Sequence, residues 1–281
     1  MTIEAAKEMS RASMPAGLPV RLDDVSVAFP SAAGPLVALR NLTLDIPAGS
    51  LTVVIGPNGC GKSTLLRVIA GLVAPTSGDV QLGEGARDAP QAGDGRVGLA
   101  FQQPRLVPWL STLENVALPL ALARAPIAQR RGRALEALER VGLADATGLR
   151  PAQLSGGMAQ RAGLARALIT DPPVLLLDEP FSALDALTRE GFDGELQSLW
   201  MDRPRTVVLV THSVSEAVRM ADRIVVMTAR PGSVARMIPV DLPRPRRAAL
   251  SGEPAAAAID ATVRATLAEV HPADLTPWGD R

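Results

Sequence analysis

Four short runs of apolar residues occur along the chain, and each is continuous rather than alternating with polar positions. They are Leu51–Ile55, Val174–Leu177, Val207–Val210 and Ile224–Met227. Strands that are buried on both faces of a parallel sheet show this pattern, whereas a strand with one solvated face alternates. We therefore expect these runs to form the central strands of a parallel sheet in an α/β protein.

A different pattern, with a period near 3.6 residues, marks the stretch between the first two strands. Leu113–Leu122 and Arg130–Val141 both show this helical period. The second pattern places three apolar residues on one helix face, Leu135, Leu138 and Val141. We interpret residues 103–164 as a mostly helical insertion within the α/β unit.

The two ends of the chain differ in composition from the part between them. Residues 1–19 are rich in Ala, Ser and Pro and predict a flexible leader without the apolar segment of a signal peptide. Residues 20–245 are expected to form the folded domain. Residues 246–281 predict a tail with a short helix near 258–270. No apolar run approaches the ~20 residues that a membrane-spanning helix needs.

Composition and charge exclude several classes of function. The chain has 281 residues, and its 29 basic and 29 acidic residues give a net charge of zero, so it lacks the basic field that holds nucleic acid. Cys60 is the only cysteine, which excludes an intrachain disulfide. Only Lys7 and Lys62 are lysines, and Lys62 alone lies in the expected domain. At position 62 the compact ammonium group of lysine is favoured over the planar guanidinium group of arginine.

The segment Gly56–Ser63, GPNGCGKS, matches the phosphate-loop pattern G-x-x-x-x-G-K-[ST], between a predicted strand and a predicted helix. Its glycines let backbone N–H groups surround phosphate oxygens, and the helix N-terminus adds a favourable dipole. Lys62 is expected to reach the β- and γ-phosphates, and Ser63 to ligate Mg²⁺. A glycine turn that only precedes a helix seldom has this full spacing.

The segment VLLLDEP places Asp178 and Glu179 at the carboxyl end of a buried strand, where open α/β sheets bind ligands. Asp178 is suited to hold Mg²⁺ through water, and Glu179 to orient and deprotonate an attacking water. Taken alone, such a strand ending is more often a solvated turn. The phosphate loop in the same chain favours the catalytic interpretation.

The segment LSGGMAQR predicts a helix start at which Ser155 is the cap and Gly156 and Gly157 expose N–H groups to an anion. By itself it fits an ordinary helix start equally well. The expected buried face of this helix consists of Met158, Ala162, Ala165, Leu168 and Ile169.

With these motifs in this order, residues 21–245 resemble the nucleotide-binding subunit of ATP-binding cassette (ABC) transporters. In that family GPNGCGKST is the Walker A loop, LSGGMAQR the signature and VLLLDEP the Walker B motif. Gln102 matches the Q-loop glutamine, Ser182–Asp185 the D-loop and His212 the switch histidine. Phe29 matches the aromatic residue that stacks on adenine, for which a π-face suffices.

The resemblance implies a P-loop NTPase core with a parallel sheet, an N-terminal antiparallel β region and a helical subdomain, with ATP and Mg²⁺ as cofactors. The implied catalytic residues are Glu179, His212 and Gln102. The implied Mg²⁺ ligands are Ser63, Gln102 and Asp178. The residues implied to bind nucleotide are Phe29, Gly56, Pro57, Asn58, Gly59, Cys60, Gly61, Lys62, Ser63, Thr64, Ser155, Gly156, Gly157 and Asp185.

The resemblance also implies a head-to-tail homodimer, in which each ATP lies between Walker A of one subunit and the signature of the other. Ser155 and Gly157 would then meet the γ-phosphate, and Gln102 would link the sheet to the helical insertion. Closure and reopening of the dimer would drive separate transmembrane permease subunits, with a periplasmic substrate-binding protein acting indirectly. The expected place is the cytoplasmic face of the bacterial inner membrane, as a peripheral protein, and no nucleic acid is involved.

Three segments look like the nitrate/taurine/sulfonate class of ABC importers: FQQPRLVPWLSTLENVALPL, ALDALTRE and ARPGSVARMIPVDLPRPR. The chain departs from this class at Ser213-Val214-Ser215, where acidic residues are usual, and at Ala159, where a basic residue is common. Neither departure concerns an atom assigned to catalysis. We therefore expect the departures to alter the protein surface or the coupling to transport rather than to abolish activity.

The leading hypothesis is an ATP hydrolase that powers import of a small anionic nutrient, a sulfonate, taurine or nitrate. An importer of a thiamine precursor and an exporter stay open as alternatives. A non-transport ABC ATPase usually has two cassettes or a long coiled-coil insertion, which this chain lacks. A subunit that binds nucleotide without hydrolysis is disfavoured by Glu179 and His212. Trp109 is expected either to dock a permease helix or to pack within the insertion.

Overall fold

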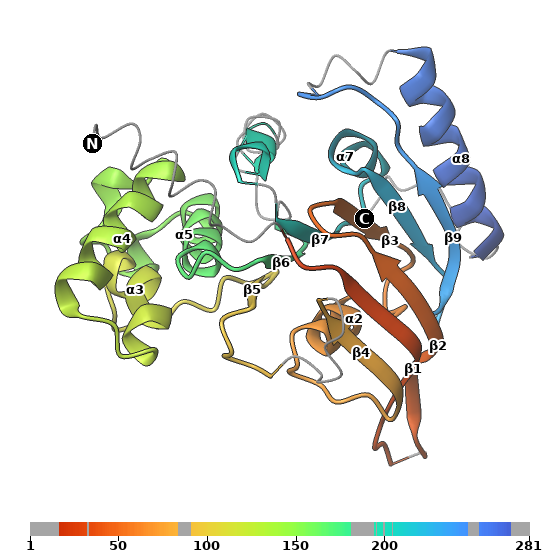
Figure 1. Ribbon diagram of the computed structural model, residues 1–281, viewed down its shortest axis with the longest axis horizontal. Helices are drawn as coiled ribbons and strands as arrows, with labels where there is room; N and C mark the ends of the chain where they lie inside the picture. The colour runs from red at the N-terminus through yellow and green to blue at the C-terminus, as the bar shows by residue number, and fades with distance from the viewer. Residues whose placement is uncertain are drawn as a thin grey trace.

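A six-stranded sheet lies at the centre of the computed structural model (Figure 1). The strands lie in the order β5-β6-β7-β3-β8-β9; the first five run parallel, and β9 pairs antiparallel with β8. The strands are β3 (Leu51–Ile55), β5 (Val97–Ala100), β6 (Val174–Asp178), β7 (Thr206–Val210), β8 (Arg223–Met227) and β9 (Val234–Pro239). The structure describes residues 17–32, 34–83, 91–180, 194, 196–198, 200–203, 205–246 and 253–270.

A second sheet has three antiparallel strands in the order β2-β1-β4. They are β1 (Val20–Phe29), β2 (Leu36–Ile46) and β4 (Ser77–Leu82). This sheet is the antiparallel β region that the family resemblance implied. It packs against one face of the six-stranded sheet, with helix α2 (Lys62–Ile69) contributing to the same apolar cluster.

The described helices after α2 that Figure 1 labels fall into two groups, which lie toward opposite ends of the central sheet and belong to the same apolar cluster. At the end near β5, the insertion holds α3 (Thr112–Leu122), α4 (Ile127–Arg140), the short 3-10 turns η1 (Ala144–Ala146) and η2 (Pro151–Gln153), and α5 (Gly156–Leu168). Toward the end near β9 lie α7 (Val214–Met220) and α8 (Pro254–Val270). Among the described residues, no helix has both the length and the apolar character to cross a bilayer.

The central strands are buried on both faces, as their continuous apolar runs predict. All five residues of β3, β6 and β7 are buried. In β3, Leu51, Val53 and Ile55 face the cluster that includes the helical insertion, whereas Val54 faces the cluster shared with the antiparallel sheet. Strand β3 therefore lies in the core, and the loop that follows it starts from a fixed point.

The helical insertion is present, but its buried face differs from the expected one. Leu135 of α4 is 41% exposed, so its assignment to the buried face was wrong. Ala134 and Ala137 lie on the inner face instead, beside the predicted Leu138 and Val141. Small residues face inward because α4 packs closely against α3 and α5. On α5, Gln160 and Leu164 are buried in addition to the predicted residues Ala162, Ala165 and Ile169.

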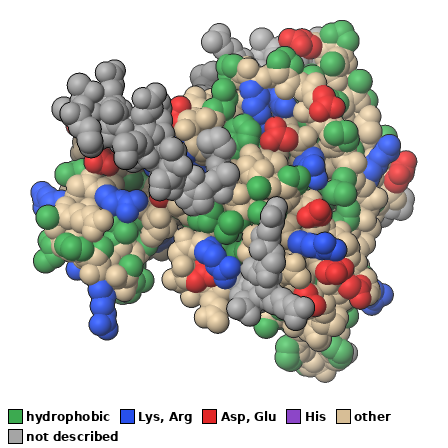
Figure 2. Space-filling view, in the orientation of Figure 1, with side chains coloured by type: hydrophobic (Ala, Val, Ile, Leu, Met, Phe, Trp, Pro, Cys, Tyr) green, Lys and Arg blue, Asp and Glu red, His purple; other side chains and the backbone are tan. Residues whose placement is uncertain are grey.

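The surface carries both signs of charge. Basic and acidic side chains are interspersed over the face shown in Figure 2, as expected for a chain with zero net charge.

The packed body extends beyond both boundaries expected from the sequence. At the N-terminal end, Gly17 is buried, and the carbonyl oxygen of Leu18 accepts a hydrogen bond from the Thr206 hydroxyl at 2.6 Å. At the C-terminal end, Arg246 is only 4% exposed, although it is the first residue of the expected tail. The helix expected near 258–270 is also longer, since α8 begins at Pro254.

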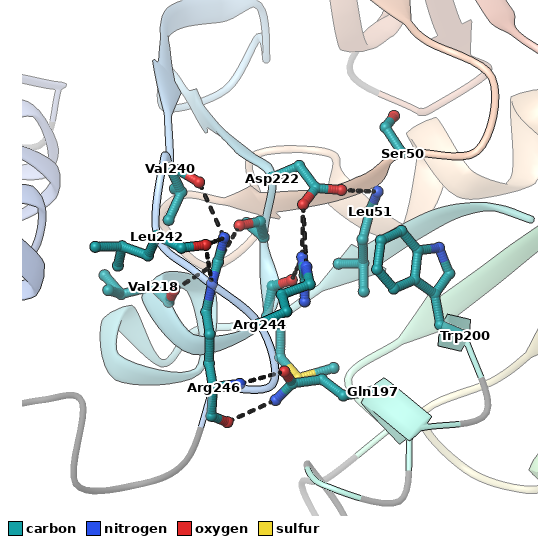
Figure 3. Close-up of polar contacts among 12 residues, drawn as sticks. Ser50, Leu51, Gln197, Trp200, Val218, Asp222, Val240, Leu242, Arg244 and Arg246 are labelled. Carbon is teal, nitrogen blue, oxygen red and sulfur yellow. Dashed lines mark hydrogen bonds and ion pairs between the residues drawn. The ribbon is translucent and has the colours of Figure 1, made fainter. Parts of the chain in front are cut away.

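Residues 240–246, here called the C-terminal strap, join three separate parts of the fold (Figure 3). The Arg246 guanidinium donates to the carbonyl oxygens of Val218 and Ala221 at the end of α7. It also donates to the carbonyl oxygens of Val240 and Leu242 within the strap, both at 2.9 Å. Carbonyls at the C-terminal end of a helix lack partners within the helix, so this guanidinium stabilises α7.

The strap also contacts Gln197 and Trp200, which precede β7 in the chain. The Gln197 side chain exchanges two hydrogen bonds with the Arg246 backbone, at 3.0 and 2.9 Å. The Arg244 guanidinium lies 4.5 Å from the centre of the Trp200 ring and donates to Asp222 at 2.7 Å. Asp222 in turn accepts from the Leu51 amide at the start of β3.

Burial, with the nearby charge of Arg244, lowers the pKa of the Arg246 guanidinium to about 10, so this group stays charged at neutral pH.

We expect Arg246→Met to destabilise the protein by about 3 kcal/mol, because buried carbonyl oxygens lose a charged donor. Thermal and urea unfolding measure the change. Arg236→Met on the exposed face of β9 is the matched control and should lie within about 0.5 kcal/mol of the parent. Equal stability of the two variants would show that the strap does not support α7.

Candidate active site

Three neighbouring strands, β6, β7 and β3, bring polar residues to one edge of the central sheet. Asp178 and Glu179 come at the end of β6, Thr211 and His212 follow β7, and the phosphate loop follows β3. A cleft of about 580 Å³ opens at this edge. Its lining consists of Phe29, Leu36, Ala38, Asn58, Gly59, Gly61, Lys62, Ser63, Thr64, Gln102, Glu179, His212 and Arg230.

The phosphate loop curls around the ammonium group of its lysine. Lys62 is 6% exposed, and its Nζ donates to the carbonyl oxygens of Gly56 at 2.8 Å and Pro57 at 3.0 Å. The side chain of Cys60 is fully buried, and burial raises the pKa of its thiol. Cys60 therefore belongs to the site through its backbone, while its sulfur packs in the core below the loop.

A second loop, residues 228–233, supports the phosphate loop from behind. Gly232 donates through its amide to Ala38 at 2.9 Å and accepts from the Arg40 amide at 3.0 Å, which ties the loop to β2. A β-carbon at Gly232 would overlap the carbonyl group of Cys60. Only glycine allows the two backbones to approach this closely.

Asp178 and Ser63 meet at the floor of the site. The Ser63 hydroxyl donates to Asp178 Oδ1 at 3.1 Å. Burial raises the pKa of the Asp178 carboxyl, and the hydrogen bond from Ser63 opposes that rise. The two side chains together offer the hard oxygen atoms that Mg²⁺ prefers.

Glu179 occupies a strained backbone position. Its φ of 45° lies in the left-handed region, which non-glycine residues adopt at functional sites when the surroundings over-determine it. Its amide donates to the Val210 carbonyl oxygen at 3.0 Å, and its Oε2 accepts from Gln102 Nε2 at 3.0 Å. The same Oε2 lies 3.5 Å from His212 Nδ1. The hydrogen bond from His212 lowers the pKa of Glu179, and the charges of His212 and Lys62 act in the same direction, so the carboxylate is ionised at neutral pH.

His212 lies in a turn that its neighbours hold in place. The Thr211 hydroxyl donates to the buried Glu216 and accepts from the Ser213 amide at 3.0 Å. The Ser213 hydroxyl accepts from the Glu216 amide and so caps α7. The serine that departs from the class pattern at position 213 therefore has a structural role next to the site.

The signature residues do not line this cleft. Ser155 caps α5 by accepting from the Met158 amide at 3.2 Å, and Gly156 and Gly157 form the first residues of that helix. They lie on the helical insertion and not among the lining residues.

Most of the sequence-predicted site residues are thus brought together, including Phe29 at the end of β1. Asp185 lies outside the described residues. Sequence reasoning missed Leu36, Ala38 and Arg230, because ordinary residues on β2 and on the loop after β8 join the lining through tertiary packing alone. Sequence reasoning also assigned no role to Gln160, although this residue lies within the signature segment LSGGMAQR.

Comparison with protein families and with proteins of known structure gives consistent matches. The family model described as "ABC transporter" matches residues 39–182. The aliphatic sulfonates import ATP-binding protein SsuB 1 of Mesorhizobium japonicum is 48% identical over 214 residues, which cover 76% of this chain and 78% of that protein. The bicarbonate transport ATP-binding protein CmpD of Synechocystis sp. is 42% identical over 228 residues, 80% of each chain.

A solved structure shares the fold. It is the dimeric structure of a post-hydrolysis state of an ATP-binding cassette bound to ADP and Pi. The match has a TM-score of 0.72 and 36% identity, and it covers 79% of this chain and 99% of that one.

We expect Gly232→Ala to weaken ATP binding at least about tenfold, because the new methyl group displaces the Cys60 carbonyl and with it the phosphate loop. Isothermal titration with ATP measures the affinity. Gly132→Ala in α4 is the control, since a β-carbon there meets no other atom within 4 Å. It should leave ATP affinity unchanged and raise stability by up to about 1 kcal/mol. Unchanged ATP affinity in Gly232→Ala would contradict the supporting role of this loop.

Proposed function

Because this chain belongs to the ABC transporter family and is the ATP-hydrolysing subunit of an importer, we propose that it powers the uptake of a small anionic nutrient, an aliphatic sulfonate, taurine or nitrate. The observation that carries the ATPase part is the meeting of Lys62, Gln102, Glu179 and His212 around one cleft. Small anions are favoured as cargo because the similar importer subunits are named for sulfonates and bicarbonate.

We propose the following roles in hydrolysis. Lys62 and the backbone N–H groups of the phosphate loop bind the β- and γ-phosphates, and Phe29 stacks on the adenine ring. Glu179 orients a water molecule and accepts its proton, while Gln102 and His212 hold the Glu179 carboxylate in position. The water oxygen bonds to the γ-phosphorus, the bond from that phosphorus to the bridging oxygen breaks, and ADP and phosphate form.

Ser63 and Asp178 are the residues that fit Mg²⁺. Their side-chain oxygens already lie 3.1 Å apart at the floor of the cleft. No cage of three or more His, Cys, Asp or Glu side chains exists within the described part of the chain. Ser63 and Asp178 would hold the ion together with the phosphates of ATP, as is usual for Mg²⁺ at a phosphate loop. When bound, Mg²⁺ neutralises charge that develops on the phosphate oxygens.

We propose a head-to-tail homodimer as the active form. The signature residues Ser155 and Gly157 lie outside the cleft of their own subunit and are exposed or half-buried at the start of α5. In a homodimer they would approach the γ-phosphate held by the other subunit. The dimeric state of the similar solved cassette supports this arrangement.

The proposed partners are two permease subunits, which would meet the helical insertion at the cytoplasmic face of the membrane. Three large apolar side chains of this insertion are strongly exposed: Trp109 at 73%, Leu122 at 77% and Ile127 at 77%. The exposure of Trp109 favours docking over internal packing. A periplasmic substrate-binding protein would act on the permease rather than on this chain.

We expect Glu179→Gln to lower kcat for ATP at least about 100-fold, because the amide cannot accept the proton of the attacking water. ATP binding should persist, since Lys62 and the phosphate loop are unchanged. A steady-state phosphate-release assay and an ATP-binding titration measure the two effects. Glu139→Gln on the exposed face of α4 is the control and should match the parent. If Glu179→Gln and the parent turn over at the same rate, Glu179 is not the base.

The cargo is tested by growth of a strain that lacks this gene. Taurine or an alkanesulfonate serves as sole sulfur source, and nitrate separately as sole nitrogen source. We expect failure on one of them, rescued by the parent gene but not by Lys62→Ala. Normal growth on all of these sources would contradict the proposed cargo but not the ATPase. Bicarbonate-limited growth and a thiamine precursor are then the next conditions.

A further inference from the structure

Gln160 connects the signature helix to the residues around the catalytic carboxylate. It lies in the second turn of α5 and is 5% exposed. Its Nε2 donates to the backbone carbonyl oxygen of Gln102 at 3.0 Å and lies 3.5 Å from that of Glu179. A side-chain amide has two N–H groups, so one nitrogen serves both carbonyls.

The Gln160 side chain contacts Glu179 at its backbone carbonyl oxygen, next to the strained φ angle. The Glu179 amide is held by the Val210 carbonyl of β7, and the Glu179 carbonyl faces Gln160. The backbone with a φ of 45° is therefore held from the sheet on one side and from α5 on the other. Such backbone persists only where its surroundings over-determine it.

The same amide acts on the second residue that touches the Glu179 carboxylate. Gln102 donates through its side chain to Glu179 Oε2, while its own carbonyl oxygen accepts from Gln160. Both the backbone of Glu179 and the group that orients its carboxylate are therefore linked to one buried side chain.

The energetics of Gln160 argue against a purely stabilising role. Its Oε1 is buried and has no hydrogen-bond partner among the described residues. The two neighbouring carbonyl oxygens determine the orientation of the amide, because they accept only from nitrogen. A buried polar atom without a partner is unfavourable, and an apolar side chain of the same shape would avoid this cost.

We propose that Gln160 is a positioning residue that couples the signature helix α5 to Glu179 and Gln102 of the same subunit. The inference rests on the proposed role of Glu179 and on the proposed dimer. In that dimer, the start of α5 contacts the ATP of the other subunit, whereas Glu179 acts on the ATP of its own. A shift of α5 toward the partner's nucleotide moves the amide of Gln160, and the carbonyls of Gln102 and Glu179 move with it. The occupancy of one site thereby sets the geometry of the other.

A neighbouring residue provides the matched control. Arg166 lies on the same helix and donates to the carbonyl oxygens of Pro104 and Arg105, in the loop that follows Gln102. It ties α5 to this loop as Gln160 does, but its hydrogen bonds go to Pro104 and Arg105 and not to Glu179 or Gln102. Arg166→Met therefore removes a helix-to-loop contact without acting on the carboxylate.

The test uses the full chain and compares the parent with Gln160→Met, Arg166→Met and Glu179→Gln. We expect Gln160→Met to lower kcat at least about tenfold through misplacement of the carboxylate, with KM for ATP within about twofold and Tm no lower than the parent. Arg166→Met should keep kcat within about twofold even if its Tm falls. A parent-like kcat in Gln160→Met, or an equal loss in both variants, overturns the proposal.

A double-mutant cycle separates positioning from a general structural effect. Because Gln160 acts through Glu179, Gln160→Met should lower the residual rate of Glu179→Gln by less than about twofold. If the double variant loses kcat by the product of the two separate losses, the proposal is overturned. If Gln160→Met does not fold, Gln160→Leu, which also lacks a donor and adds no charge, takes its place in the cycle with the same expected outcomes. Full activity in Glu179→Gln alone would refute the role of Glu179, a failure distinct from that of the Gln160 link.

Discussion

The active site depends on the register of three parallel strands. Val54 of β3 and Asp178 of β6 both pair with Val210 of β7. The backbone ladder then continues one step past the strands, since Glu179 donates to Val210 and Thr211 donates to Val54. Side chains alternate between the two faces of a strand, so a slip of one residue would turn Asp178 away from Ser63. The chemistry of the cleft is therefore tied to the hydrogen bonds of the sheet.

Much of this arrangement follows from the sequence, because local patterns determine it. The apolar runs located four central strands, and the glycine spacing located the phosphate loop. The comparison with a solved cassette confirms the predicted ABC ATPase fold. The positions of Glu179 and Gln102 could be assigned from motifs, but the 45° φ of Glu179 could not, since it results from contacts with β7 and α5.

What the sequence did not reveal are contacts between segments distant along the chain. Gly232 belongs to no recognised motif. The reason that no side chain fits at this position is its contact with the Cys60 backbone, which only the structure shows. Leu135 was assigned to the inner face of α4 because leucine is apolar. The close approach of α3 and α5 instead favours small residues on that face, which are Ala134 and Ala137. Arg246 falls in a stretch that resembles a linker by composition, and its buried guanidinium depends on carbonyls of α7.

The C-terminal strap also affects the order in which the protein matures on the ribosome. A growing chain emerges from its N-terminus, so the Lys62 loop and β3 are made well before β7 and β8, which flank β3 in the sheet. Helix α7 follows, but its last carbonyls meet the guanidinium only after Arg246 has been synthesised. A product that ends before residue 246 would contain each nucleotide-binding motif and still lack the contact that holds α7.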